Sequence, residues 1–343
     1  MKLFPTAPRL ALTLLVASTL SAALTLGTGC TKKSGPTLWI YTSIYPHVVD
    51  DLTAKVAAKF PGVTIKWYQG GSENVAAKVN SELLSGKTQA DLIISSDLFW
   101  YEDLRAKNLF LAYDSQATAK VPAQFKEPGH FWSASRVPVM VVAYNSDVFS
   151  AAEAPRGFAD LALPKFKDKV AMPSPLESGT TFTAVALIQR KLGWDYFSKL
   201  RANGAISAGG NSAVMARIES KERPVGMVLL ENVLTARKRN PKIVAVYPVE
   251  GAVTIPSPIA ITASTAQPEL AKQVYDYFFS REAQEALTKG DMYSIFTDID
   301  PPVGAEPWMK VLAASMPWDL KLIQEVRAQR DSIKQQFSKL MLE

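Results

Sequence analysis

The stretch TLWIYTSIYPHVVDDLTAKVAAKFPGVTIKWYQGGSENVAAKVNSELLSGKTQADLIISS, residues 37–96, decides the fold of this chain. Its short apolar runs predict strands, and its runs with apolar residues at helical spacing predict helices. In chain order these are a strand at 37–42, a helix at 48–60, a strand at 63–68, a helix at 74–84 and a strand at 90–95. Strands that alternate with helices at this spacing predict a parallel α/β sheet with right-handed crossovers.

Two long extended segments, 137–144 and 253–262, divide the rest of the chain. A second set of strands and helices lies between them, and the sequence after them is mostly helical, ending with a helix at 320–341. The economical interpretation is an α/β protein of two lobes, in which the chain crosses out at the first segment and back at the second. We therefore assign residues 37–136 and 260–343 to the first lobe and residues 137–259 to the second.

The first 30 residues have the pattern of an export signal. Two positive charges, at Lys2 and Arg9, precede an uncharged apolar run that ends in small residues and Cys30. This pattern is typical of a secretory signal, and a cysteine directly after small residues is similar to a bacterial lipobox. We expect a lipoprotein-type signal at 1–30, a lipid on Cys30, a linker at 31–36 and a periplasmic protein held to a membrane. A plain cleaved signal with an incidental cysteine and an uncleaved anchor stay open as alternatives.

Composition excludes several classes of function. The chain has 343 residues with one cysteine and two histidines, so we expect neither a disulfide framework nor a zinc site of Cys and His ligands. The formal net charge of +6, from 38 basic and 32 acidic residues, is only mildly basic and does not indicate nucleic-acid binding. A G-x-S-x-G elbow, a P-loop and a G-x-G-x-x-G motif are all missing. We therefore expect no enzyme, no cofactor and no metal.

Small hydroxyl and glycine residues follow the strands of both expected lobes. In open α/β sheets, ligands bind beyond the carboxyl ends of strands, where helix N-termini offer free N–H groups to anions. The candidate residues at these ends are Ser43, Tyr45, Gly71, Ser72, Ser96, Ser178, Gly179, Thr180, Thr181, Asn211 and Ser212. Each of them can equally be a helix cap or part of a turn. Their recurrence at strand ends in two lobes favours one shared anion site.

Two charged residues complete the candidate site. Arg136 stands where the first crossing begins, and an arginine there can clamp an oxyanion with two hydrogen bonds or form a structural ion pair across the hinge. Glu231 follows the expected strand at 225–229. Its carboxylate can accept from the hydroxyls or the ammonium of a ligand, or it can stabilise the start of a helix.

The order and spacing of several segments along the chain are similar to those of a known protein family. The segments are IYTSIYPHVVDDLTAKVAAKFPGV, GGSENVAAKV, QADLIISSD, RVPVMVVAYNSDVF, FADLALPKFKDKVAMPSP, SGTTFTAV, YPVEGAVTIPSPIAIT and YSIF. Through them, nearly the whole chain after the signal resembles the periplasmic substrate-binding proteins of ABC importers. The resemblance is to family 1, the group with ferric-ion, phosphonate and sugar-phosphate binders. It implies a two-lobed clamshell of periplasmic-binding-protein type II with two crossing strands between the lobes.

The resemblance also implies roles for individual residues. A phosphate or phosphonate group would bind against the turn at 178–181, with Arg136 beside it and Glu231 near the organic part. Ferric-ion binders of the group hold iron with two neighbouring tyrosines after the strand that matches 225–229, where this chain has Glu231 and Asn232. Tyr45 stands where those proteins often carry a histidine. Because iron(III) prefers phenolate ligands, the missing tyrosine pair favours an organic anion.

The sequence thus favours an extracytoplasmic solute-binding component of an ABC importer that binds a small phosphate- or phosphonate-bearing organic solute. The expected partners are this anionic solute, an inner-membrane ABC permease and, through the lipid on Cys30, a membrane; nucleic acid is not expected, and the protein is expected to be a monomer. Three alternatives remain: a binder of ferric or another metal ion with a rearranged site, a hydrolase such as a phosphatase, and a sensor that presents its closed shape to a membrane receptor.

Overall fold

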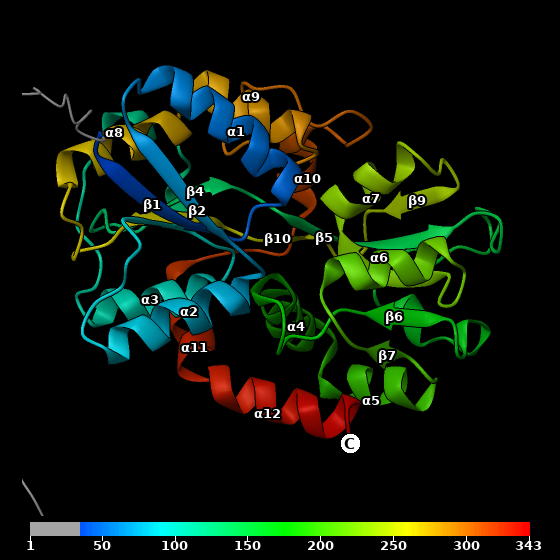
Figure 1. Ribbon diagram of the computed structural model, residues 1–343. Coiled ribbons are helices and arrows are strands. Elements are labelled where there is room, and N and C mark those ends of the chain that lie inside the picture. The colour runs from blue at the N-terminus through cyan, green and yellow to red at the C-terminus, as the bar shows by residue number, and fades with distance from the viewer. Residues whose placement is uncertain (1–34) are drawn as a thin grey trace, which may run out of the picture. The chain divides into compact units, whose positions relative to one another are not determined.

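The computed structural model describes residues 35–343 of the chain. The expected signal peptide, Cys30 and most of the expected linker lie outside the described residues. Two separate β-sheets run through the described residues, and helices cover both of them (Figure 1). We call the first sheet with its helices the first lobe, and the second sheet with its helices the second lobe.

The first sheet has five strands in the order β2-β1-β3-β11-β4. Their bounds are β1 Thr37–Thr42, β2 Thr64–Gln69, β3 Leu92–Ile94, β4 Ser133–Arg136 and β11 Ser257–Ile261. Strand β1 pairs in parallel with β2 and β3, as the sequence predicts. Strand β11 is antiparallel to both β3 and β4, so the sheet is mixed.

Helices cover both faces of the first sheet because successive strand residues point to opposite sides. From β1, Leu38 and Ile40 join the apolar cluster of Leu52 on α1, whereas Tyr41 joins the cluster of Val79 on α2. Figure 1 accordingly shows α1, α8 and α9 on one side of this sheet and α2 and α3 on the other. The bounds of the first-lobe helices are α1 Pro46–Lys59, α2 Ser72–Leu84, α3 Leu98–Ala106, α8 Pro268–Phe278, α9 Arg281–Lys289 and α10 Trp308–Ala314.

The second sheet has six strands, in the order β10-β5-β8-β6-β7 with β9 paired to β5. Their bounds are β5 Val139–Asn145, β6 Val170–Met172, β7 Ile206–Ser207, β8 Val225–Leu229, β9 Ile243–Val246 and β10 Val253–Thr254. Every residue of β5, β6 and β8 is buried, which requires helices on both faces. These helices are α4 Gly179–Leu192, α5 Trp194–Ala202, α6 Asn211–Glu219 and α7 Leu230–Arg237.

The two sheets are joined by two crossing segments that lie side by side. The first crossing passes from β4 to β5 through Pro138, and the second passes from β10 to β11 through Pro256. The N–H of Ile255 donates to the carbonyl of Pro138 at 2.8 Å, which ties the crossings together between the sheets. The sequence predicts one extended run at 253–262, but the structure divides it into β10 of the second sheet and β11 of the first, with Ile255 and Pro256 between them. The architecture is the two-lobed α/β fold with two crossings that the sequence predicts.

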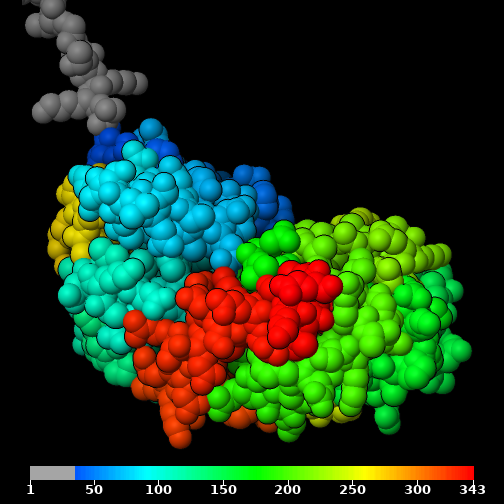
Figure 2. All heavy atoms as spheres, turned by 90° about the horizontal axis from the view of Figure 1, so that it is seen from below, coloured from blue at the N-terminus to red at the C-terminus, as the bar shows by residue number. Residues whose placement is uncertain are grey.

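The C-terminal segment contacts both lobes. The expected helix at 320–341 is two helices that meet at Gln329: α11 Leu320–Ala328 packs on α3 of the first lobe, and α12 Arg330–Met341 packs on α5 of the second. Phe337 of α12 lies edge to face on Phe197 of α5, with 5.5 Å between the ring centroids. Figure 2 shows this red segment lying across cyan atoms of the first lobe and green atoms of the second. This contact with both lobes differs from the lobe boundaries predicted from the sequence, which assigned all of 260–343 to the first lobe.

Among residues 35–343, none of the helices combines the length and the apolar character that a membrane span requires.

Candidate functional site

Five helices begin at the wall of one cavity between the lobes. Its volume is about 450 Å³, and its lining includes the N-cap residues of α1, α2, α4, α6 and α7, which are Tyr45, Gly71, Ser178, Gly210 and Leu229. The first N–H groups of a helix have no acceptor within the helix and carry the positive end of its dipole. Helices from both lobes therefore direct positive potential into this cavity.

The cavity contains most of the site predicted from the sequence. All the candidates except Gly179 and Thr181 line it, namely Ser43, Tyr45, Gly71, Ser72, Ser96, Arg136, Ser178, Thr180, Asn211, Ser212 and Glu231. Sequence reasoning missed the rest of the lining, which is Pro46, Gln69, Gly70, Glu177, Gly210, Ala213 and Leu229. Most of these missed residues are direct neighbours of a predicted one, so the rule on strand ends could have found them if widened by one or two positions.

Gly179 does not face the cavity, because its N–H bonds to the other lobe. It donates to Oγ of Ser72 at 2.7 Å. A Cβ at position 179 would lie 2.7 Å from Cβ of Asp97, so only glycine permits this approach of α4 to the first lobe. The expected role of the Gly179 amide in oxyanion binding is thus replaced by a contact between the lobes.

Thr181 also lies away from the cavity. Its N–H donates to Oγ of Ser178 at 3.3 Å, which is the side-chain cap of α4. Its own hydroxyl is fully buried and has no partner among residues 35–343. The sequence left open that these residues form a helix cap. In the structure, Ser178 caps α4 by accepting from the N–H of Thr181.

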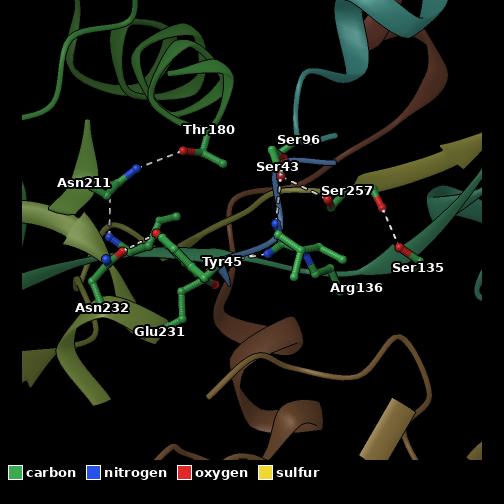
Figure 3. A network of polar contacts seen from close by, with 12 residues as sticks. Ser43, Tyr45, Ser96, Ser135, Arg136, Thr180, Asn211, Glu231, Asn232 and Ser257 are labelled. Carbon is green, nitrogen blue, oxygen red and sulfur yellow. Dashed lines mark hydrogen bonds and ion pairs between the residues drawn. The ribbon is translucent and has the colours of Figure 1, made fainter. Parts of the chain in front are cut away.

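The hydroxyl of Thr180 is positioned from two sides. Oγ of Ser178 lies 2.8 Å from Oγ1 of Thr180, and Nδ2 of Asn211 donates to Oγ1 of Thr180 at 3.1 Å. Oδ1 of Asn211 accepts from the N–H of Leu229 at 3.2 Å, which fixes the orientation of the amide (Figure 3). The starts of α4, α6 and α7 are thereby joined into one rigid rim in the second lobe.

Arg136 and Glu231 form a buried ion pair at the cavity. Nη1 of Arg136 donates to Oε1 of Glu231 at 3.1 Å, and the two side chains are only 2% and 3% exposed. Burial raises the pKa of Glu231, while the charge of Arg136 and its hydrogen bond oppose that rise. Nε of Arg136 is buried without a partner among the described residues. Of the two roles considered for Arg136, the structure shows the ion pair across the lobes; the clamp on an oxyanion stays a prediction, although both residues line the cavity.

Serines of the first lobe surround the guanidinium. Nη2 of Arg136 donates to Oγ of Ser96 at 3.2 Å, and this oxygen lies 2.9 Å from Oγ of Ser257 and 3.5 Å from Oγ of Ser43 (Figure 3). Oγ of Ser135 donates to the carbonyl of Ser257 at 3.3 Å. Sequence reasoning missed Ser257, although it is the first residue of β11 at the second crossing and so stands in the same position as Arg136 at the first.

A direct hydrogen bond joins the lobes at Tyr45. Its hydroxyl donates to Oδ1 of Asn232 at 2.8 Å, from the start of α1 to the first turn of α7 (Figure 3). Burial, followed by the negative charge of Glu231, raises the pKa of Tyr45, so the phenol keeps its proton at neutral pH and can donate. Asn232 was not among the predicted site residues.

Residues 35–343 hold no cluster of three His, Cys, Asp or Glu side chains that could bind a metal ion. In this part of the chain, the phenol of Tyr45 and the carboxylate of Glu231 are engaged with Asn232 and Arg136. The polar side chains that line the cavity carry hydroxyls, amides, one guanidinium and the carboxylates of Glu177 and Glu231.

Comparison with known proteins gives a family match. The profile described as "bacterial extracellular solute-binding protein" matches residues 87–309. A putative 2-aminoethylphosphonate-binding periplasmic protein of Salmonella paratyphi A is 24% identical over 242 residues, which are 67% of this chain and 69% of that protein. A probable ABC transporter periplasmic-binding protein of Sinorhizobium fredii is also 24% identical, over 67% of this chain and 66% of that protein.

Solved structures share the fold. The periplasmic binding protein AfuA from Actinobacillus pleuropneumoniae, with fructose-6-phosphate bound, aligns with a TM-score of 0.78 and 21% identity over 89% of this chain and 98% of its own. Iron-bound HitA from Pseudomonas aeruginosa aligns with a TM-score of 0.78 and 18% identity over 88% of this chain and 99% of its own. The chain therefore has the two-lobed periplasmic-binding-protein fold.

Proposed function

The chain belongs to the family of bacterial extracellular solute-binding proteins, and from this premise we propose that its interlobe cavity binds a small phosphate- or phosphonate-bearing organic solute. As a member of this family, it is a solute-binding component of an ABC importer and acts in the periplasm. Our proposal goes further and concerns the class of solute. Family membership does not fix that class, because the relatives of this chain are named as binders of different ligands.

One observation carries this proposal: five helix N-termini, from both lobes, line a single cavity. Each N-terminus is equivalent to roughly half a positive charge, and its free N–H groups are suited to phosphate oxygens. The side-chain charges of Arg136 and Glu231 offset each other. The helix starts therefore supply the positive potential that an oxyanion needs, and the family resemblance to phosphonate and sugar-phosphate binders agrees with this chemistry.

In this mechanism, the oxyanion binds where the starts of α2 and α4 meet. Ser72 contributes from the first lobe and Thr180 from the second, so a bound ligand bridges both lobes. Arg136 adds charge-assisted hydrogen bonds, and each such bond is worth about 1.5–3 kcal/mol. Glu231 accepts from an ammonium or hydroxyl group on the organic part. Because the ligand contacts both lobes only when they are closed, its binding favours the closed state.

The test is isothermal titration calorimetry of the purified protein with inorganic phosphate, 2-aminoethylphosphonate, fructose 6-phosphate and ferric citrate. We expect at least one of the organic phosphorus compounds to bind with micromolar or better affinity and inorganic phosphate to bind more weakly. Ferric binding that develops visible colour, with no binding of any phosphorus compound, would show that the ligand class is wrong. Mass spectrometry of compounds that copurify with the protein identifies the natural solute.

We also propose that Cys30 carries a lipid that holds the protein to a membrane. The support comes from the sequence around Cys30, where a charged start, an apolar run and small residues precede the cysteine. In the expressing bacterium, a Cys30→Ser variant is expected to leave the membrane fraction. A membrane-bound Cys30→Ser protein would contradict lipid anchoring at this residue.

A further inference from the structure

A second, smaller chamber adjoins the main cavity between the lobes. Its volume is about 240 Å³, and Tyr45, Ser212 and Glu231 line both spaces. Residues shared by two neighbouring cavities lie between them, so these three side chains form the wall that separates the main cavity from the side chamber. Asn232 lines only the side chamber.

Tyr45 is the part of this wall whose hydroxyl bonds to the other lobe. Its hydroxyl donates to Oδ1 of Asn232 at 2.8 Å, and its ring stacks on His47 with 6.2 Å between centroids and 15° between planes. The ring comes from the first lobe and Asn232 from the second, so the closed arrangement of the lobes holds the wall in place (Figure 3). Without that hydrogen bond, the ring keeps its stacking on His47 and its apolar packing but loses its contact with the second lobe.

The two spaces differ in charge. Arg136 and the N-termini of α2 and α4 face the main cavity, which suits an anion. The side chamber is lined by Glu219 and Glu231, and Arg239 is its cation. Both hydrogen bonds of Arg239, from Nε at 3.1 Å and Nη2 at 2.8 Å, go to Glu219. Since Arg239 is paired with Glu219, and Arg136 with Glu231, the side chamber offers an anion no unpaired Lys or Arg among the described residues and suits an uncharged or cationic group.

From this arrangement we propose that Tyr45, held by Asn232, is a partition that limits the length of the ligand. The anionic head occupies the main cavity, and the organic tail ends at the Tyr45 ring. When the ring is released, the side chamber accepts a longer tail that carries an ammonium or hydroxyl group. This proposal rests on the proposed function, because it assumes that an organic anion binds in the main cavity.

The test compares two aminoalkylphosphonates that differ only in length, 2-aminoethylphosphonate and 6-aminohexylphosphonate. Calorimetry gives the ratio of their dissociation constants for the wild-type protein and for the variants Asn232→Ala and Tyr45→Ala. We expect the wild-type protein to prefer the short probe, and each variant to shift the ratio at least tenfold toward the long probe. Asn232→Ala removes the hydrogen-bond acceptor but keeps the Tyr45 side chain. It therefore tests the proposal even if Tyr45→Ala does not fold.

The matched control is Tyr247→Phe. Tyr247 also forms a hydroxyl contact between the lobes, with Oη of Tyr293 at 3.2 Å, but it lines neither space. Its variant should keep the wild-type ratio within about twofold. If Asn232→Ala and Tyr45→Ala bind both probes but keep the wild-type ratio, the partition is wrong while the proposed function stands. If the wild-type protein binds neither probe nor any other phosphorus compound, the proposed function fails, and the partition fails with it.

Discussion

Thr180 illustrates how single side chains prepare the cavity for an anion. Its hydroxyl is held by Ser178 and Asn211 at the start of α4 and lines the cavity. The donor groups of the second lobe are therefore already in place without a ligand. A preorganised site loses less side-chain entropy when the ligand binds than a flexible one.

The first prediction concerns this hydroxyl. Thr180→Val keeps the shape of the side chain but removes its hydrogen bonds, so affinity for the organic anion should fall roughly 10- to 100-fold, equivalent to about 1.5–3 kcal/mol. Thr183→Val is the matched control, because Thr183 is buried on the same helix, its hydroxyl has no partner within the described part of the chain, and it does not line the cavity. Calorimetry that finds equal losses in both variants would contradict a ligand contact at Thr180.

The second prediction concerns pH. Burial raises the pKa of Glu231 and Arg136 opposes that rise, so Arg136→Met should raise this pKa further. A carboxyl whose folded pKa lies above its unfolded value contributes stability below the unfolded pKa and loses it as pH rises through the folded pKa. The melting temperature of Arg136→Met should therefore fall between pH 5 and pH 8 by several degrees more than that of the wild type.

The control for this effect is the double variant Arg136→Met with Glu231→Gln. It removes the titrating group, so its melting temperature should change with pH no more than that of the wild-type protein. Differential scanning fluorimetry at both pH values measures the three proteins. Parallel pH profiles for the single and double variants would mean that Glu231 does not carry the effect.

At the level of elements, the start of α4 brings the second lobe into direct contact with the first. Gly179 of α4 donates to Ser72 of α2, and Phe182 of α4 lies edge to face on Phe99 of α3 with 5.4 Å between centroids. Each of these contacts joins an element of one lobe to an element of the other. The start of α4 therefore both lines the cavity and helps to close it.

The third prediction tests this approach. In Gly179→Ala, the new Cβ would lie 2.7 Å from Cβ and 3.1 Å from Cα of Asp97, so the lobes should be unable to close fully. We expect weaker ligand binding and a larger radius of gyration by small-angle X-ray scattering in the presence of ligand. The wild-type protein with the same ligand is the reference for full closure. A Gly179→Ala protein as compact as the wild type with ligand would show that α4 does not limit closure.

At the scale of the whole molecule, α12 connects the lobes outside the cavity. Its apolar face packs on α5, while Arg330 pairs with Asp97 of the first lobe and Lys334 pairs with Glu73 at 3.2 Å. Glu73 and Asp97 directly follow Ser72 and Ser96, which line the cavity. The C-terminal helix thus neutralises two carboxylates that would otherwise stand behind the anion site.

The fourth prediction follows from the burial of Asp97, which is 0% exposed. Arg330→Met would leave this carboxylate without its cation, and breaking a buried ion pair costs about 3–5 kcal/mol. The free energy of unfolding from urea denaturation should fall by that amount. Arg281→Met, which removes an exposed pair with Glu285, should cost less than about 1 kcal/mol. Similar small losses in both variants would contradict a structural role for the Arg330 pair.

The sequence alone predicted most of the elements and most of the residues that line the cavity. The alternation of strands and helices follows from local periodicity, because burial of one face fixes the spacing of apolar residues. Ser43, Ser72, Ser96, Ser178 and Asn211 could be predicted as neighbours because residues beyond strand ends gather at one edge of a sheet. Their roles in ligand binding remain predictions.

Only the tertiary structure decided which polar groups pair with each other. Gly179 donates to a serine 107 residues away, Arg136 pairs with a carboxylate 95 residues away, and Tyr45 with an amide 187 residues away. Such choices depend on how closely two lobes approach, and no local pattern encodes that distance. Two further features were likewise visible only in the tertiary structure. Residues 320–341 form two helices, and α12 contacts both lobes. Local hydrogen bonding and burial set each element, whereas contacts between distant elements set the partners of each buried polar group.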